Sequence, residues 1–313
     1  MADSEKQMMS VEEVLKNKSD NVNLKTPSTS RGSDKNLSTI YNKKQLELKE
    51  QTYKLESFEK NYLLLFIQQD VNDLEKCEVI TEKNVFLIEK TFQMFGFEIE
   101  KYINLTKDEI FEKLKIFKTK DFSDYGCIIV VVLTNETFDG SLRAMDALFK
   151  ERDIMIYLKN KENLSMVTKP KILVVQTHRE TKSTTITHQG EKVLKDEYRD
   201  DFYTLPLSSD ILVLRSSYPG RSSHNEEKYG SWFIWTLCQE IVRNSPKLDF
   251  ECIITIVRRN VSRDMEYTFN AVTGESNEFN LMPVSTSTFI RKLYFRKYRD
   301  YTLWQDFYEN IFD

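Results

Sequence analysis

Short apolar runs alternate with amphipathic segments along much of the chain. Residues 63–67 are all apolar, and a run of this length predicts a buried strand. Val85, Ile88, Phe92 and Phe95 then recur at the spacing of one helix face. This part of the chain therefore predicts a strand followed by an amphipathic helix.

A second amphipathic helix is predicted to begin after residue 106. Thr106 and Glu109 have the three-residue spacing of a capping box, in which each side chain binds the other residue's backbone N–H. Ile110, Leu114 and Phe117 follow on one helix face. We expect this face to lie against the same sheet as the first strand.

The longest apolar runs predict strands that are covered on both faces. Residues 128–133 and 172–175 lack polar alternation, as is typical of parallel sheets, and residues 210–214 add another strand. Two helices are predicted after them, over residues 230–243 and 249–263. The alternation of strands and helices predicts an α/β fold with a mostly parallel central sheet and helices on both faces.

Composition restricts the class of protein. The chain has 313 residues, of which 40% are hydrophobic, and this is enough for a sizeable core. A formal net charge of -4 gives no basic surface for nucleic acid or an anionic membrane. No apolar run approaches the roughly 18 residues that a transmembrane helix needs. We expect neither nucleic acid nor membrane as a partner.

Cysteine usage and the N-terminus indicate the compartment. The four cysteines lie far apart and form no C-x-x-C pair: Cys77, Cys127, Cys238 and Cys252. The N-terminus lacks an apolar targeting region, so a reducing, cytoplasmic location is predicted. His178 and His188 are ten residues apart in a polar segment with no evident third ligand, so we predict neither a metal site nor a cofactor.

Two strand ends carry the motif that says most about function. Residues 176–180 read Q-T-H-R-E, which resembles the caspase nucleophile motif Q-A-C-[RQG]-G with His178 in place of the cysteine. Residues 134–136 read T-N-E, where the caspase pattern has its catalytic histidine and then a glycine. The resemblance implies that Asn135 replaces the base. It also implies that Glu136 replaces a glycine whose N–H binds the oxyanion, so its carboxylate is expected to repel developing negative charge.

Further segments extend the resemblance over more than two hundred residues. Residues 208–220 and 230–234 are similar to the family's "ADFL…YSTxPGY…GSWFI". Residues 89–92 and 96–99 are similar to "RETF…YEV", and residues 292–295 to "KELYF". The chain thus resembles a catalytically degenerate caspase homologue of the insect or other invertebrate kind. The implied fold is layered, with a sheet of about six strands.

The resemblance also implies a damaged substrate pocket. Caspases hold the substrate aspartate with two arginines and the glutamine of the nucleophile motif. Gln176 is present, but the later arginine falls on Asn225 and its neighbouring tryptophan on His224. The earlier arginine falls near Glu78. Arg215 and Arg221 are alternative sources of the missing positive charge, although both are expected to be solvated surface residues.

The same resemblance predicts how the chain is divided. Residues 1–52 are polar and are predicted to be a disordered, prodomain-like segment. Residues 53–180 form a large-subunit-like region and residues 206–296 a small-subunit-like region. Residues 181–205 resemble the linker at which caspases are cut, although its charges are also compatible with a merely solvated loop. Residues 297–313 form an aromatic C-terminal extension.

One strand is predicted to mediate association, because caspases dimerise through the strand that precedes "KELYF". The corresponding residues are Val284, Ser285, Thr286, Ser287, Thr288, Phe289 and Ile290. This strand is more polar than the family's version, and an unpaired edge favours a partner. An active or pro-form caspase is the expected partner in a heterodimer, with a homodimer as the alternative.

These patterns leave four functional hypotheses. The first is an inactive, decoy-like partner that regulates active caspases in apoptosis, by activation or by inhibition. The second is a scaffold that binds death-pathway adaptors or inhibitors. The third is an active cysteine endopeptidase with non-standard catalytic residues. The fourth is an expressed relic without a role. The first accounts for the loss of both Cys and His at the dyad positions.

Overall fold

The computed structural model describes nine stretches of the chain. They are residues 41–69, 74–137, 139–159, 163–179, 209–217, 225–226, 230–245, 247–272 and 282–296. The segment 181–205, the extension 297–313 and residues 1–40 lie outside them. Predictions about processing, the aromatic tail and disorder before residue 41 therefore stay predictions.

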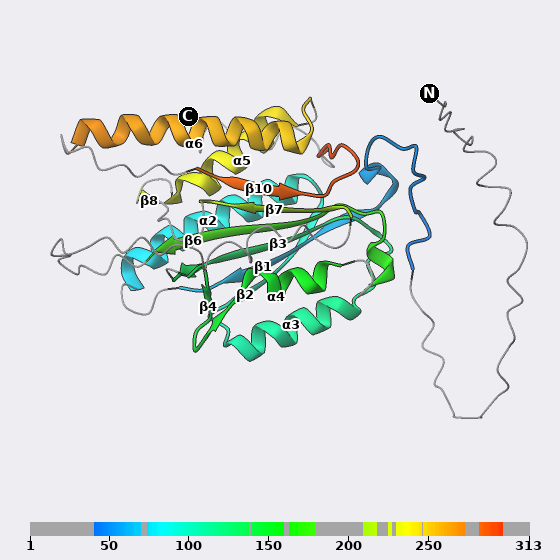
Figure 1. Ribbon diagram of the computed structural model, residues 1–313, viewed down its shortest axis with the longest axis horizontal. Helices are drawn as coiled ribbons and strands as arrows, with labels where there is room; N and C mark the ends of the chain where they lie inside the picture. Colours follow the sequence, from blue (N-terminus) through cyan, green and yellow to red (C-terminus); the bar gives the residue numbers. More distant parts are fainter. Residues whose placement is uncertain are drawn as a thin grey trace, which may run out of the picture. The chain divides into compact units, whose positions relative to one another are not determined.

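A central sheet has the strand order β10-β7-β6-β3-β1-β2 (Figure 1). The bounds are β1 Lys60–Ile67, β2 Phe97–Ile103, β3 Tyr125–Glu136, β6 Lys171–Arg179, β7 Ile211–Arg215 and β10 Val284–Ser287. All neighbours on this path are parallel except β10, which is antiparallel to β7. Outside this path, a hairpin of β4 (Leu142–Arg143) and β5 (Leu148–Phe149) continues from β3, and β8 (Asn225–Glu226) pairs with β9 (Gly230–Ser231). The predicted mostly parallel sheet is confirmed.

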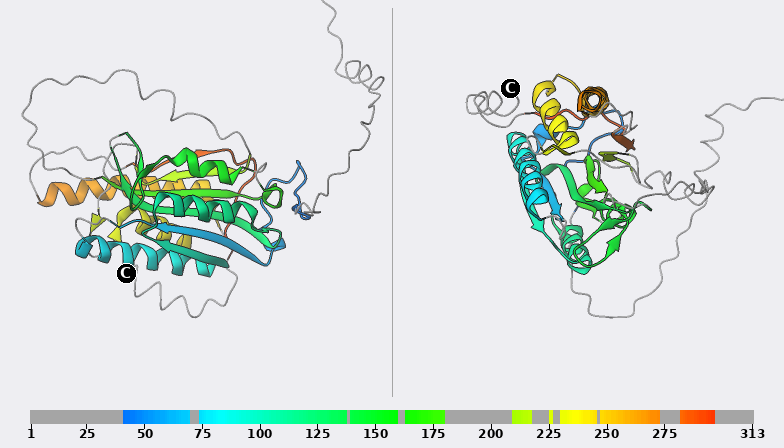
Figure 2. Two further views of the ribbon diagram at one scale, coloured as in Figure 1. Left: turned by 90° about the horizontal axis from the view of Figure 1, so that it is seen from below. Right: turned by 90° about the vertical axis from the view of Figure 1, so that its left-hand side faces the viewer.

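Helices cover both faces of this sheet (Figure 2). One face carries α2 (Leu74–Met94), α5 (Trp232–Asn244) and α6 (Phe250–Val272). The other carries α3 (Lys107–Thr119), α4 (Glu151–Met155) and the short helices η2 (Ile156–Leu158) and η3 (Leu164–Met166). A further short helix, η1 (Leu55–Ser57), precedes β1. The predicted α/β layering is therefore confirmed.

Strand alternation divides the core between the two faces. Ile129 and Val131 of β3 pack with the α2, α5 and α6 side, whereas Ile128 and Val130 pack with the α3 and α4 side. All four are buried, so the strand has no solvated face and its sequence reads as a continuous apolar run. This explains why the pattern predicted a doubly covered strand.

Two helix boundaries differ from the predictions, and one cap agrees with them. Thr106 Oγ1 accepts from Glu109 N at 3.3 Å, and the reciprocal bond from Thr106 N is present, so the capping box is confirmed. However, α2 begins at Leu74 and α6 continues to Val272. No Gly or Pro interrupts either extension, so both helices continue beyond the residues on which the predictions relied.

The folded part begins before the predicted boundary at residue 52. Asn42 is buried, and its Nδ2 donates to Val167 O at 2.7 Å. Leu46 N donates to Thr168 Oγ1 at 3.1 Å. Residues 41–52 are thus bound to the domain by hydrogen bonds, so their prediction as part of a disordered segment was wrong. These contacts are hydrogen bonds between polar groups, so the hydrophobic pattern of the sequence does not indicate them.

Candidate functional site

The two positions predicted for the catalytic dyad lie side by side. Asn135, at the end of β3, is the register partner of His178 on β6. Glu136 is likewise the partner of Arg179. Asn135 is buried, while the side chain of His178 is outside the described part of the structure. Sequence reasoning therefore identified two residues that the fold brings together at the carboxyl ends of adjacent parallel strands.

Gln176, the pocket residue predicted to survive, is fully buried and engaged with protein groups. Its Oε1 accepts from Ser231 Oγ at 2.6 Å, and its Nε2 donates to Thr177 O at 3.1 Å. Ser231 N in turn donates to Asn84 Oδ1 of α2 at 2.8 Å. These bonds join the end of β6 to the start of α5 and to α2.

A glycine allows this approach of α2 to the start of α5. Gly230 has a φ of +80°, and a Cβ there would meet Asn84 Oδ1 at 2.6 Å. A side chain at this position would therefore strain the backbone and collide with Asn84. Asn225, which the resemblance aligns with the later arginine, pairs with Ser231 through β8 and β9. Because Ser231 also binds Gln176, the backbone of Asn225 lies near that residue, and its role in a pocket stays a prediction.

The remaining pocket positions are only partly described. Glu78 lies within α2 on the described backbone, but its side chain is outside the described part. His224 lies outside it altogether, as does His188. Their predicted roles stay predictions.

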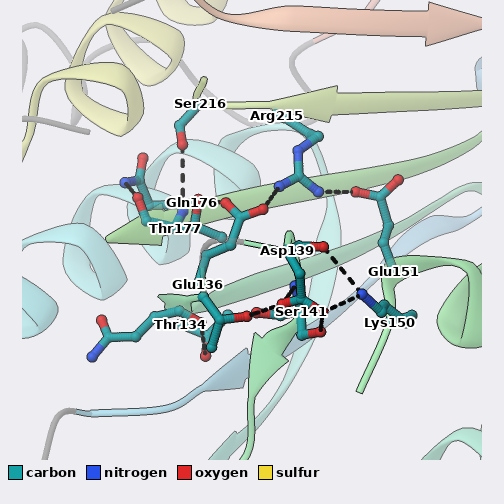
Figure 3. A network of polar contacts seen from close by, with 12 residues as sticks. Thr134, Glu136, Asp139, Ser141, Lys150, Glu151, Gln176, Thr177, Arg215 and Ser216 are labelled. Carbon is teal, nitrogen blue, oxygen red and sulfur yellow. Dashed lines mark hydrogen bonds and ion pairs between the residues drawn. The ribbon is translucent and has the colours of Figure 1, made fainter. Parts of the chain in front are cut away.

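Glu136 belongs to a buried ion-pair network that the sequence did not reveal (Figure 3). Arg215 Nη2 lies 2.6 Å from Glu136 Oε1, and Arg215 Nη1 binds Glu151. Thr177 Oγ1 donates to the other Glu136 oxygen at 2.8 Å. Burial raises the pKa of Glu136, while Arg215 and Thr177 oppose this shift.

Two expectations about these residues were wrong. Arg215 is not a solvated surface residue: only 7% of it is exposed, because its guanidinium is held by two carboxylates. Glu136, 4% exposed, points toward the α4 side of the sheet, whereas Gln176 points toward α5. Strand alternation places Asn135 on the side of Gln176. The Glu136 carboxylate is therefore neutralised on the face opposite the dyad positions and is not aimed at them.

None of the described thiols lies at these strand ends. Cys127 on β3 and Cys238 on α5 are fully buried, and burial raises the pKa of the Cys238 thiol to about 12. Cys252 on α6 is exposed, and a hydrogen bond with Asp249 raises the pKa of its thiol. A reactive cysteine needs a lowered thiol pKa, so these three environments do not favour nucleophilic chemistry.

The described residues contain no cluster of three or more His, Cys, Asp or Glu side chains that could hold a metal ion. Among the same residues, no helix combines the length and apolarity needed to cross a membrane.

The strand predicted for association lies at one edge of the sheet. β10 pairs with β7 from Val284↔Arg215 to Ser287↔Leu212, and no other strand of the described chain pairs with it. The strand ends at Ser287 and not at Ile290, although Thr288 N still donates to Ile211 O at 2.7 Å. The prediction of an edge strand is confirmed, with a shorter extent.

The profile of the caspase domain matches residues 67–294, which is most of the described fold. The chain belongs to the caspase-domain family. The matched region includes both strand ends and the edge strand β10. Asn135, His178 and Gln176 all lie at the carboxyl ends of the adjacent strands β3 and β6 within this region.

Individual caspases share less than a third of their residues with the matched part of this chain. Caspase-6 of Gallus gallus is 28% identical over 220 residues, which cover 66% of this chain and 70% of that protein. Caspase-6 of Mus musculus is 30% identical over 183 residues, or 56% of this chain and 66% of its own length. The chain thus spans about two thirds of the length of these relatives.

Solved caspase structures confirm the fold. The crystal structure of caspase-1 from Spodoptera frugiperda has a TM-score of 0.62 at 23% identity, covering 82% of this chain and 97% of that chain. The structure of pro-sf-caspase-1 gives the same TM-score at 24% identity. The predicted caspase-like layered fold is therefore correct.

Proposed function

We propose that this protein is a catalytically inactive caspase homologue that regulates an active or pro-form caspase by pairing with it. The observation that carries the proposal is the register pair of Asn135 and His178. In the caspase pattern the first position holds the histidine base and the second holds the cysteine nucleophile. Here Asn135 stands in place of the histidine, and His178 stands in place of the cysteine.

Cysteine peptidase chemistry requires a thiolate and an imidazole that protonates the leaving amine. The amide of Asn135 does not titrate, so it cannot act as a base. His178 carries an imidazole and provides no thiolate. Cys127 and Cys238 are buried away from this edge, and Cys252 is on α6. These placements support an inactive site and weigh against the hypothesis of an active endopeptidase.

The edge position of β10 supports pairing with another caspase. Among the described strands only β7 pairs with β10, so a strand of a second chain would add main-chain hydrogen bonds along its outer side. We place the pairing in the cytoplasm, in the regulation of apoptosis. A heterodimer is proposed ahead of a homodimer because the strand is polar, so that an apolar caspase strand would contribute most of the buried surface.

Catalytic inactivity is tested on the purified protein. We expect no cleavage of aspartyl peptides and no labelling by an aspartyl ketone probe, while a purified active caspase is labelled under the same conditions. His178→Cys should remain inactive because Asn135 provides no base. Labelling of any cysteine in the unmodified protein that also blocks peptide cleavage would refute the proposal.

The partner is tested separately by co-purification from cells that contain caspases. Recovery of a caspase, with a changed turnover of that caspase when the protein is added, supports the regulatory function and shows whether it activates or inhibits. Recovery of only non-caspase death-pathway proteins would favour the scaffold hypothesis instead.

A further inference from the structure

Three elements that are distant in sequence meet at the Glu136 network. Arg215 lies on β7, Glu136 on β3 and Glu151 at the first position of α4. Because β6 lies between β7 and β3, the Arg215 side chain reaches across a strand to its partner (Figure 3). The Glu136 side chain is only 2% exposed, whereas that of Glu151 is 25% exposed.

The network continues into the loop that follows β3. Lys150, next to Glu151, lies 2.9 Å from Asp139 Oδ2. Asp139 also accepts from Ser141 Oγ at 2.8 Å and from Thr137 Oγ1. The β4–β5 hairpin lies between Ser141 and Lys150 in the sequence, so the residues on both sides of it share polar contacts with Asp139.

We propose that Arg215, Glu136 and Glu151 form a charged clasp that fixes the β4–β5 hairpin and joins the chain before segment 181–205 to the chain after it. The clasp is a conformational device and does not depend on the proposed function. An ionised carboxylate that is almost completely buried is stable only when its charge is paired and its oxygens accept hydrogen bonds. Arg215 and Thr177 meet both requirements for Glu136.

The clasp predicts unequal effects for its members. Arg215→Met leaves the Glu136 charge buried without a cation, so its thermal midpoint should fall by about 10 °C. Glu136→Gln keeps an oxygen for Thr177 and leaves Arg215 paired with Glu151, so a fall of only a few degrees is expected. The double variant Arg215→Met/Glu136→Gln removes both the buried guanidinium and the buried carboxylate, so neither is left without its partner. The double variant should therefore be more stable than Arg215→Met alone.

Two measurements test this order of stability in the full chain. Thermal unfolding compares the three variants with Lys101→Met, which removes an exposed ion pair with Glu89 and should change the midpoint by about one degree or less. Hydrogen exchange of the β4–β5 hairpin should become at least several-fold faster in Arg215→Met and in no control. General destabilisation would accelerate exchange throughout the chain, whereas loss of the clasp accelerates it first in this hairpin.

Additive effects would overturn the inference. If the double variant is no more stable than Arg215→Met, the loss comes from the packing of the arginine stem and not from an unpaired charge. Should Arg215→Met fail to fold, the double variant decides: its folding supports the clasp, and its failure to fold contradicts it.

Discussion

Two lysines at the N-terminal end of β6 are almost completely buried: Lys169, which precedes the strand, and Lys171, its first residue. Lys169 Nζ donates to Phe122 O and to Ser123 O, and Lys171 Nζ donates to Lys169 O at 2.7 Å. Carbonyl oxygens satisfy these donors but do not fully replace the lost hydration of an ammonium ion. Burial consequently lowers the pKa of Lys169 to about 7 and that of Lys171 to about 8.

These lysines predict a pH dependence of stability. In the unfolded chain their pKa returns to about 10.5, so between about pH 7 and pH 10 the unfolded state binds more protons than the folded state. Stability should therefore rise with pH from about pH 7. Above about pH 9 the buried thiols of Cys127 and Cys238, whose pKa burial raises, oppose this rise because they lose their protons more readily in the unfolded chain. Urea unfolding at pH 7, 8 and 9 measures the effect.

Removing the titratable groups provides the control for this prediction. The double variant Lys169→Met/Lys171→Met should lose most of the rise in stability, whereas Lys49→Met, at an exposed position, should keep it. An unchanged slope in the double variant would show that other groups cause the dependence.

At the scale of elements, β10 has two different edges. Thr288 N donates to Ile211 O, so the alternation of an antiparallel strand directs the N–H of Thr286 toward β7 as well. The N–H groups of Ser285 and Ser287 then point to the free edge. Ser285 Oγ also accepts a hydrogen bond from Arg258 of α6, and this bond connects the strand to that helix. A partner strand would therefore use Ser285 and Ser287.

This alternation predicts which proline blocks pairing without unfolding the domain. Ser287→Pro removes an outward N–H and places a ring at the free edge, so co-purification with a caspase should fall at least tenfold while thermal unfolding changes by only a few degrees. Ser287→Ala retains the N–H and should bind normally. Thr286→Pro removes an inward donor and should lower the unfolding temperature as well. Equal recovery of the partner with Ser287→Pro would place the interface elsewhere.

Periodicity predicted most elements, because burial on both faces of β3 and β6 leaves an apolar run that is visible in a single sequence. The dyad positions were also predictable, since each lies at the end of such a run. The ion pair of Arg215 and Glu136 was not, because its members are 79 positions apart and meet only when β6 lies between their strands. The bond from Ser231 to Gln176 depends in the same way on where α5 begins.

In the whole molecule, the chain before and the chain after segment 181–205 build the same cores. β6 and β7 pair in parallel over five register positions, and both hydrophobic clusters contain residues from each side. The N-terminal part adds a third connection, since Tyr53 Oη donates to Asp210 Oδ1 at 2.8 Å. Arg291 lies 3.5 Å from the same carboxylate oxygen. Residues near both ends of the described fold thus meet at one buried aspartate.

The two halves should therefore remain one folded unit after the chain is cut. A site for a specific protease introduced within residues 181–205 allows cleavage of the folded protein, and gel filtration should then show both fragments in a single peak at the position of the intact chain. Separation should require urea, because it exposes the apolar surface that the two fragments share. Asp210→Asn weakens the pairing with Arg291 and should lower the urea concentration at which the cut fragments separate. Fragments that elute apart without denaturant would show that the covalent connection, and not the shared core, holds the regions together.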